Sequence, residues 1–204
     1  MLWRMVASSP KVQRNPTARN SWLLGGHGGL ASFFLFEALV RKPGDASSFK
    51  ASGDDRGTTR LIVSAYLVAT LLPLASLRIQ ALKLPRAAGP AGLLLQASGI
   101  ALRVWSMRTL GDSYTRTLRT RARQPLVQNG PYRFVRHPGY AGSLLSWTGF
   151  VLTSRSIPVI ALVTALLGRV YRQRILAEET LLRRELPGYA AYGGRTRRLI
   201  PFVW

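Results

Sequence analysis

The sequence predicts an all-α, polytopic integral membrane protein with about five transmembrane helices, the last two of which form a tight helical hairpin. Five apolar runs alternate with polar segments, and 47% of the 204 residues are hydrophobic. Lys and Arg number 29 against 8 Asp and Glu, which gives a net charge of +21. Basic residues in so apolar a chain fit loops that face anionic lipid, so we expect no nucleic-acid partner.

The first three apolar runs predict three separate spans. They extend from Trp22 to Val40, from Leu61 to Leu77, and from Ala91 to Met107. About 20 helical residues cross a hydrocarbon core of about 30 Å, so each run is close to the required length. Pro73 predicts a kink in the second run. Gly25 and Gly29 have the small-xxx-small spacing that lets helices approach closely.

The last two apolar runs are short and predict the hairpin. They cover residues 140–152 and 157–168, and the polar break between them is only four residues long, 153–156. Two such helices reach a sufficient length when their polar flanks extend them. The last helix is expected to continue into water and to end near Pro187 and Gly188.

The distribution of basic residues predicts the orientation. With five spans, residues 41–60, 103–136 and 169–198 lie on one side of the membrane and carry 21 of the 29 basic residues. The positive-inside rule therefore places the N-terminus outside and the C-terminus in the cytoplasm. The two Arg-rich segments after residue 100 then share the cytoplasmic face, where we look for chemistry.

The segment from Gly130 to Gly142 is the first candidate site. Pro138 suits the first turn of a helix and would place His137 at its N-terminal cap, where free N–H groups bind anions. Tyr132 and Tyr140 offer ring faces to a cation. The competing interpretation is interfacial, because Arg and Tyr also anchor helix ends among lipid headgroups.

Two further segments follow. Arg174 and Glu178 have the i,i+4 spacing of an ordinary helix-stabilising pair, whereas Arg172 and Glu178 could face two sides of one ligand. The aromatic and basic tail after Tyr189 is either an interfacial anchor or a lid over the cytoplasmic site. The chain lacks cysteine and has two distant histidines, so we expect no metal site. No P-loop, G-x-S-x-G elbow or H-E-x-x-H motif occurs.

Several ordered motifs resemble the isoprenylcysteine carboxyl methyltransferase family. They are Leu-Val-Gln-Asn-Gly-Pro-Tyr at 126–132, Arg-His-Pro-Gly-Tyr-Ala-Gly at 136–142, Glu-Glu-Thr-Leu-Leu at 178–182, and Arg-Leu-Ile-Pro at 198–201. The resemblance covers about half of the chain, from residue 100 onward. One departure is Gln124-Pro125, where eukaryotic members have a His before the Leu-Val pair.

The resemblance implies a membrane enzyme that uses S-adenosylmethionine and releases S-adenosylhomocysteine. Carried over by position, it implies that Arg172 faces the methyl acceptor, and that Arg172 and Glu178 are catalytic. The implied cofactor residues are Leu126, Val127, Tyr132, Arg136, His137, Pro138, Gly139, Tyr140, Glu178 and Glu179. The corresponding organisation is a basic arm at 1–20, three spans on the substrate side at 21–107, and a cofactor-binding region at 108–204, with the helical hairpin at 138–176.

The resemblance leaves the acceptor open. We expect a lipophilic carboxylate that enters sideways from the bilayer, because a carboxylate is already ionised and needs no base. Related families imply a phospholipid amine or a thiol instead. The rivals of another class are an NADPH-dependent membrane reductase and a non-enzymatic adaptor that binds anionic lipid. The high Arg and Gly content is typical of a high-GC bacterium, so the inner membrane is the expected location.

Overall fold

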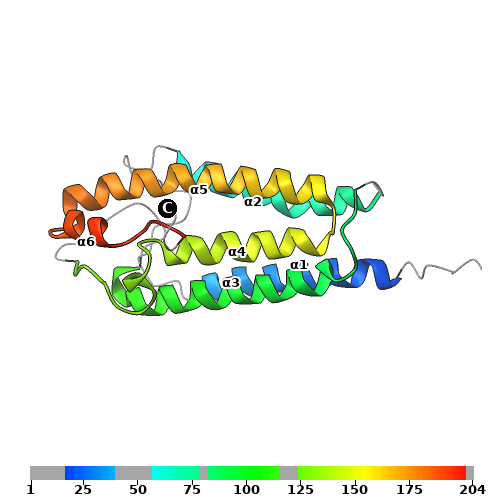
Figure 1. The fold of residues 1–204 in the computed structure, drawn as a ribbon, viewed down its shortest axis with the longest axis horizontal. Coiled ribbons are helices and arrows are strands. Elements are labelled where there is room, and N and C mark those ends of the chain that lie inside the picture. Colours follow the sequence, from blue (N-terminus) through cyan, green and yellow to red (C-terminus); the bar gives the residue numbers. More distant parts are fainter. Residues whose placement is uncertain (1–16, 40–56, 79–81, 115–123, 201–204) are drawn as a thin grey trace, which may run out of the picture.

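The computed structural model describes residues 17–39, 57–78, 82–114 and 124–200. Within these ranges the chain forms five long helices in the regions where apolar runs predicted them, together with one short helix (Figure 1). The all-α prediction is therefore confirmed. The helices are α1 (Thr17–Leu39), α2 (Thr58–Ala75), α3 (Ala88–Leu110), α4 (Pro138–Thr153), α5 (Ile157–Glu185) and α6 (Tyr189–Arg195), and the 3-10 helices are η2 (Ser76–Arg78), η3 (Gly111–Ser113) and η4 (Gly130–Arg133).

The long helices run alternately up and down a common axis. In Figure 1, the C-terminal ends of α1, α3 and α5 lie at the same end of the bundle as the N-terminal ends of α2 and α4. We call this the α6 end, because α6 lies there too. The connections from α2 to α3 and from α4 to α5 lie at the far end. Segments distant in sequence therefore meet at the α6 end.

The predicted hairpin is present, since a short turn joins α4 to α5. Arg155 in this turn has a φ of 60°, and its Nε and Nη2 donate to the carbonyl oxygen of Leu84 at 2.9 and 2.6 Å. The turn is thereby tied to the segment that precedes α3. The prediction that the last helix ends near Pro187 is also confirmed, because α5 ends at Glu185.

A glycine seam joins α3 to α4. A Cβ added at Gly92 would lie 2.7 Å from the carbonyl oxygen of Gly149, and one added at Gly142 would lie 2.7 Å from that of Gly99. These positions face backbone, so only glycine permits the approach. Gly29 of α1 makes a similar approach, to the side chain of Gln96 on α3.

The bundle exposes leucines and buries polar residues, as expected of helices that pack against one another in lipid. Leu24, Leu39 and Leu67 are 71%, 75% and 61% exposed, whereas Ser143 and Ser146 are fully buried. Among the described residues, α2 is the helix whose length and apolar composition would let it cross a membrane. The five spans stay a prediction, with which the five long helices agree.

Candidate functional site

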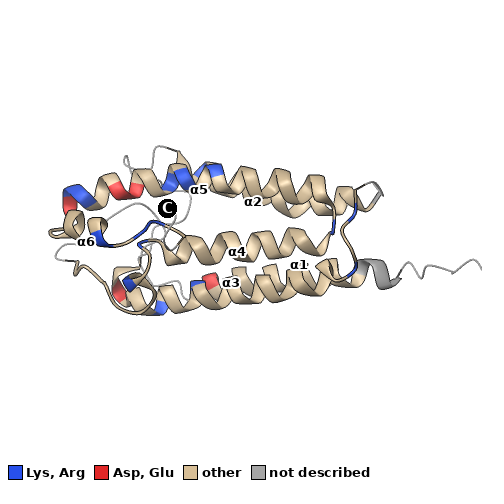
Figure 2. Ribbon diagram, viewed as in Figure 1, with Lys and Arg blue, Asp and Glu red and all other residues tan. Residues whose placement is uncertain are grey.

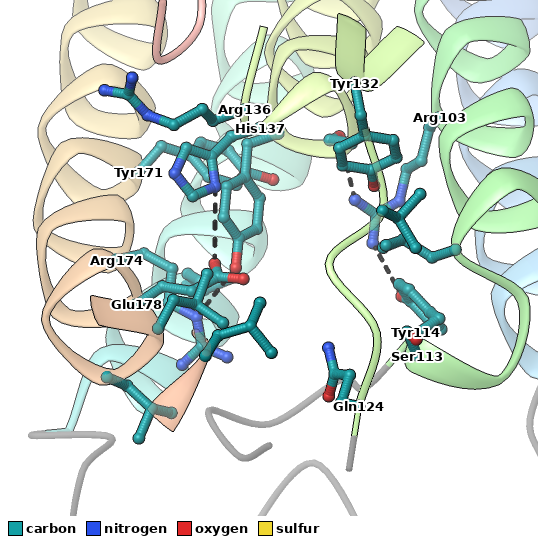
Figure 3. A pocket seen from close by; sticks show the side chains of 18 of the residues that line it. Arg103, Ser113, Tyr114, Gln124, Tyr132, Arg136, His137, Tyr171, Arg174 and Glu178 are labelled. Carbon is teal, nitrogen blue, oxygen red and sulfur yellow. Dashed lines mark hydrogen bonds and ion pairs between the residues drawn. The ribbon is translucent and has the colours of Figure 1, made fainter. Parts of the chain in front are cut away.

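A cavity of about 320 Å³ lies at the α6 end of the bundle, and all five long helices and α6 contribute to its wall. Its size falls within the range of about 300–1,000 Å³ that is typical of small-molecule sites. In Figure 2, most of the coloured positions, which mark charged residues, lie toward this end of the described chain. In Figure 3, Arg103 and Tyr114 lie on one wall, and His137, Arg174 and Glu178 lie on the facing wall.

The chain places His137 at the cavity in the way the sequence predicted. His137 is the N-cap residue of α4, and Pro138 occupies the first helical position. The backbone around it is also held from a distant part of the chain. The N–H groups of Arg136 and His137 donate to the carbonyl oxygens of Arg197 and Arg198 at 2.7 and 3.0 Å. The tail therefore folds back onto the site, which favours the lid interpretation over the interfacial anchor.

Buried polar atoms in the cavity wall are available to a ligand. Glu178 Oε2 lies 3.8 Å from His137 Nδ1 and, like the hydroxyl of Tyr189, has no hydrogen-bond partner among the described residues. Tyr189 is only 3% exposed. Burial, followed by the charges of Glu179 and Glu178, raises the pKa of Tyr189, so its hydroxyl stays protonated. The wall thus presents a hydrogen-bond donor beside a carboxylate acceptor.

Arg174 is the buried cation on the same wall. The side chain lines the cavity and the residue is 3% exposed. Its Nη1 donates to the hydroxyl groups of Thr58 and Thr59 at 2.9 and 3.2 Å, and its Nε donates to the Tyr140 hydroxyl at 3.2 Å. These hydroxyl groups help to hold the guanidinium in position on the cavity wall.

Glu179 points behind the wall and joins the tail to α4 and α5. Arg136 Nε and Arg198 Nη2 lie 2.9 and 3.0 Å from its carboxylate. Burial alone raises the pKa of Glu179, but hydrogen bonds from His137 and Arg198 and the charge of Arg136 outweigh it and lower the pKa from 4.5 to about 2. The carboxylate is therefore ionised at neutral pH, and its contribution to stability is lost only as the pH falls toward 2.

A second charged group lies on the facing wall. Arg103 Nε is 2.5 Å from Glu37 Oε1, and its Nη1 donates to the Ser143 hydroxyl at 2.8 Å. Tyr114 bridges the pair: its hydroxyl accepts from Arg103 Nη2 and donates to Glu37 Oε2, both at 3.4 Å. This cluster ties α1 to α3 and α4 beside the cavity.

Most of the cofactor residues implied by the resemblance lie together on the cavity wall. They are Leu126, Val127, Tyr132, Arg136, His137, Gly139, Tyr140 and Glu178. Pro138 and Glu179 do not line it. The guanidinium of Arg136 is bound to Glu179 and to the carbonyl oxygens of Gly193 and Thr196, both at 2.5 Å.

The structure does not bring Arg172 to the cavity, because that side chain is exposed and lies outside the wall. Helical periodicity explains the difference. Leu167, Tyr171, Arg174 and Glu178 follow one another at three- or four-residue steps and so lie on one face of α5. Arg172 lies on another face.

Sequence reasoning did not single out Tyr189, Thr59 or the Glu37–Arg103 pair as site residues. The signal for Arg174 was present, since it shares the i,i+4 spacing with Glu178. For Glu37 and Arg103, the signal in the sequence was a charged residue inside each of two apolar runs.

A helical bundle that exposes leucine and encloses charged side chains around a cavity is typical of a class, the membrane proteins with an internal binding site. The sequence model of the isoprenylcysteine carboxyl methyltransferase (ICMT) family matches residues 92–184. Taken together with the relatives described next, the match identifies a methyltransferase whose sequence is similar to this family.

The relatives agree with this assignment. The probable protein-S-isoprenylcysteine O-methyltransferase of Oryza sativa subsp. indica is 28% identical over 167 residues, which cover 78% of this chain and 87% of the rice protein. Protein-S-isoprenylcysteine O-methyltransferase B of Arabidopsis thaliana is 31% identical over 55% of this chain and 58% of its own. A solved structure of the eukaryotic intramembrane Ras methyltransferase ICMT shares the fold, with a TM-score of 0.67 at 22% identity, over 94% of this chain and 70% of that one.

Proposed function

We propose that this protein transfers a methyl group from S-adenosylmethionine to the carboxylate of a lipophilic acceptor, such as an isoprenylcysteine or another lipid acid. The relatives' names support the reaction class. The observation that carries the proposal is the pairing of a buried, cavity-facing Arg174 with unpartnered polar atoms on Glu178 and Tyr189.

The residues present fit the cofactor. Glu178 can accept hydrogen bonds from ribose hydroxyl groups or from the amino group, while the Tyr189 hydroxyl can donate to an acceptor atom. Tyr132 and Tyr140 offer ring faces to the positive sulfur. The backbone at the start of α4, beside His137, suits the carboxylate. When bound, the cofactor supplies a methyl group on a sulfonium, which needs no metal or general acid for transfer.

The acceptor's carboxylate is assigned to Arg174. A carboxylate is ionised at neutral pH, so it would need no base to accept the methyl group, and the donor's sulfonium would leave as a neutral thioether. The guanidinium would hold the carboxylate in line with the methyl group while the apolar wall excludes water. Arg136 and Glu179 act by fixing the backbone around His137.

The apolar part of the acceptor is expected to enter between α1 and α2. Phe34 and Val63 line the cavity on these helices and are 44% and 40% exposed, so the cavity wall reaches the outer surface there. Residues 21–107 would therefore form the substrate side and residues 108–204 the cofactor side. We further propose that the protein lies in a bacterial inner membrane with the α6 end in the cytoplasm, as the basic residues indicate.

The first experiment tests the cofactor site by isothermal titration with S-adenosylhomocysteine. We expect His137→Ala and Glu178→Gln each to weaken binding at least about tenfold, the effect of losing one charge-assisted hydrogen bond. Glu185→Gln is the matched control, because Glu185 is exposed and paired with Arg184. Unchanged affinity in both site variants would remove the site assignment.

A second experiment identifies the acceptor. Purified protein is incubated with donor that carries a labelled methyl group and with a membrane lipid extract, and mass analysis identifies the products. Methyl esters are the expected products. Labelled phospholipid amines or labelled thioethers would instead indicate an amine or a thiol acceptor. In a separate measurement of thermal stability, stabilisation of the protein by NADPH but not by S-adenosylhomocysteine would favour a reductase.

A further inference from the structure

An aromatic layer crosses the bundle at the inner limit of the cavity. Four helices contribute one ring each: Phe34 from α1, Tyr66 from α2, Trp147 from α4 and Tyr171 from α5. Tyr66 stacks on Trp147 with ring centroids 4.5 Å apart, and Phe34 packs edge-on against both at 6.0 and 6.2 Å. The hydroxyl groups of Tyr66 and Tyr171 are hydrogen-bonded to each other. The layer is therefore continuous from α1 to α5.

The cavity stops at this layer. Phe34, Tyr66 and Tyr171 line the cavity, and Trp147, which is fully buried behind Tyr66, does not. On the far side lies a solid core that includes Ala69 and Phe150, both fully buried. Figure 3 shows Tyr171 on the same wall as Arg174 and Glu178, so the polar groups and the layer bound one space.

We propose that this aromatic layer, with Tyr66 at its centre, is a chain-length stop for the apolar part of the methyl acceptor. The proposal rests on the proposed function, because it takes the acceptor's carboxylate to lie at Arg174. The guanidinium of Arg174 contacts Thr58 and Thr59 at 2.9 and 3.2 Å, so the carboxylate lies near their level.

The distance along α2 from Thr59 to Tyr66 sets the depth of cavity that is left for the apolar part of the acceptor. Thr59 and Tyr66 are seven residues apart, which is about 10 Å along a helix axis. An extended chain advances about 1.2 Å per backbone bond, so the depth accommodates about eight bonds. In an S-alkylated cysteine, the path from the carboxyl carbon to sulfur takes three of them. About five remain, the length of one isoprene unit. A longer chain must turn out between Phe34 and Val63, and its additional carbons then contact the surroundings instead of the cavity.

The test measures binding of S-alkyl-N-acetylcysteines with chains of 2 to 16 carbons to the full-length protein in detergent, with and without S-adenosylhomocysteine. Because partition into detergent is common to all variants, the ratio of variant to wild-type affinity isolates the cavity. We expect that Tyr66→Ala improves the relative affinity about tenfold or more for chains of nine carbons and leaves that for chains of two or three carbons near the wild-type value.

Two variants serve as controls. Tyr66→Phe retains the ring and loses only the hydrogen bond to Tyr171, so its ratio should not vary with chain length. Leu67→Ala removes the neighbouring side chain on α2, which is 61% exposed and outside the cavity wall, and should give the same flat ratio.

A ratio for Tyr66→Ala that does not change with chain length, in protein that still binds S-adenosylhomocysteine, would overturn the stop. If that variant does not fold, the dependence of wild-type affinity on chain length decides. An increase in affinity per carbon that ends near five carbons supports the stop. A steady increase up to sixteen carbons refutes it. Failure of the proposed function would give a different result. The S-alkyl-N-acetylcysteines would then bind with the expected limit near five carbons, but none of them would be methylated.

Discussion

At the scale of single residues, the cavity distinguishes two arginines that the sequence places two positions apart. Arg174 is buried, lines the cavity and is held by neutral hydroxyl groups, whereas Arg172 is exposed outside the wall. An acceptor carboxylate in the cavity would lie beside the guanidinium of Arg174, which would hold the reacting oxygen in place.

The matching prediction compares substitutions of these two residues. Arg174→Ala should lower kcat by about 10²–10³-fold, the usual cost of removing a group that positions charge in a transition state. Arg174→Lys should recover only part of the loss, because an ammonium group lacks the fork geometry of guanidinium. Arg172→Ala is the control and should retain kcat within about twofold. Steady-state kinetics with the best acceptor measures these effects, and titration with S-adenosylhomocysteine checks that the cofactor site survives. Equal losses in the two alanine variants would contradict the assignment.

The residues that could be predicted are those that local sequence determines. Pro138 predicts a helix start and therefore the capping position of His137, which the structure confirms. Arg172 shows the limit of motif transfer, because its side-chain direction depends on the phase of α5 relative to the core. The Glu37–Arg103 contact joins residues 66 positions apart, and no local pattern specifies such a pair.

At the scale of elements, the glycine seam between α3 and α4 determines the position of the site. α3 carries Arg103, and α4 begins with the backbone that flanks His137. The two helices approach until Gly142 of α4 faces the backbone of α3. Apolar runs predicted both helices, but they did not predict this seam, because glycine spacing indicates close approach without identifying the partner helix. The backbone hydrogen bond from the N–H of Arg136 to the carbonyl oxygen of Arg197 could not be predicted from local sequence either.

A single methyl group tests the seam. In Gly99→Ala the added Cβ would lie 2.5 Å from the carbonyl oxygen of Gly142, so α3 and α4 must separate. We expect a loss of about 1–3 kcal/mol in the free energy of unfolding and weaker binding of S-adenosylhomocysteine. Gly168→Ala on α5 is the control, since its Cβ meets nothing within 4 Å, and it should be neutral or stabilise by up to about 1 kcal/mol. Thermal unfolding in detergent measures both variants. Equal midpoints would show that the seam tolerates separation.

At the scale of the whole molecule, the bundle separates its charges along its long axis. Charged positions on α5 lie toward the α6 end (Figure 2), whereas Lys83, Arg86 and Arg155 belong to the connections at the far end. Alternation of the helices follows from the order of apolar runs, so the grouping of distant Arg-rich segments at one end was predictable. Which end faces the cytoplasm depends on the surrounding membrane and on the translocation machinery, so the positive-inside rule must supply it.

Two single-cysteine variants test that orientation, because the natural chain contains no cysteine and is itself the unlabelled control. Arg195→Cys places an exposed thiol at the α6 end, and Arg86→Cys places one at the far end. With a membrane-impermeant maleimide, Arg195→Cys should label in inverted vesicles and Arg86→Cys in right-side-out vesicles, since the side with more arginine stays in the cytoplasm. Labelling of both thiols from one side would mean that the long axis does not cross the bilayer. The reversed pattern would keep the spans and overturn the orientation, because the cavity would then open away from the cytoplasm.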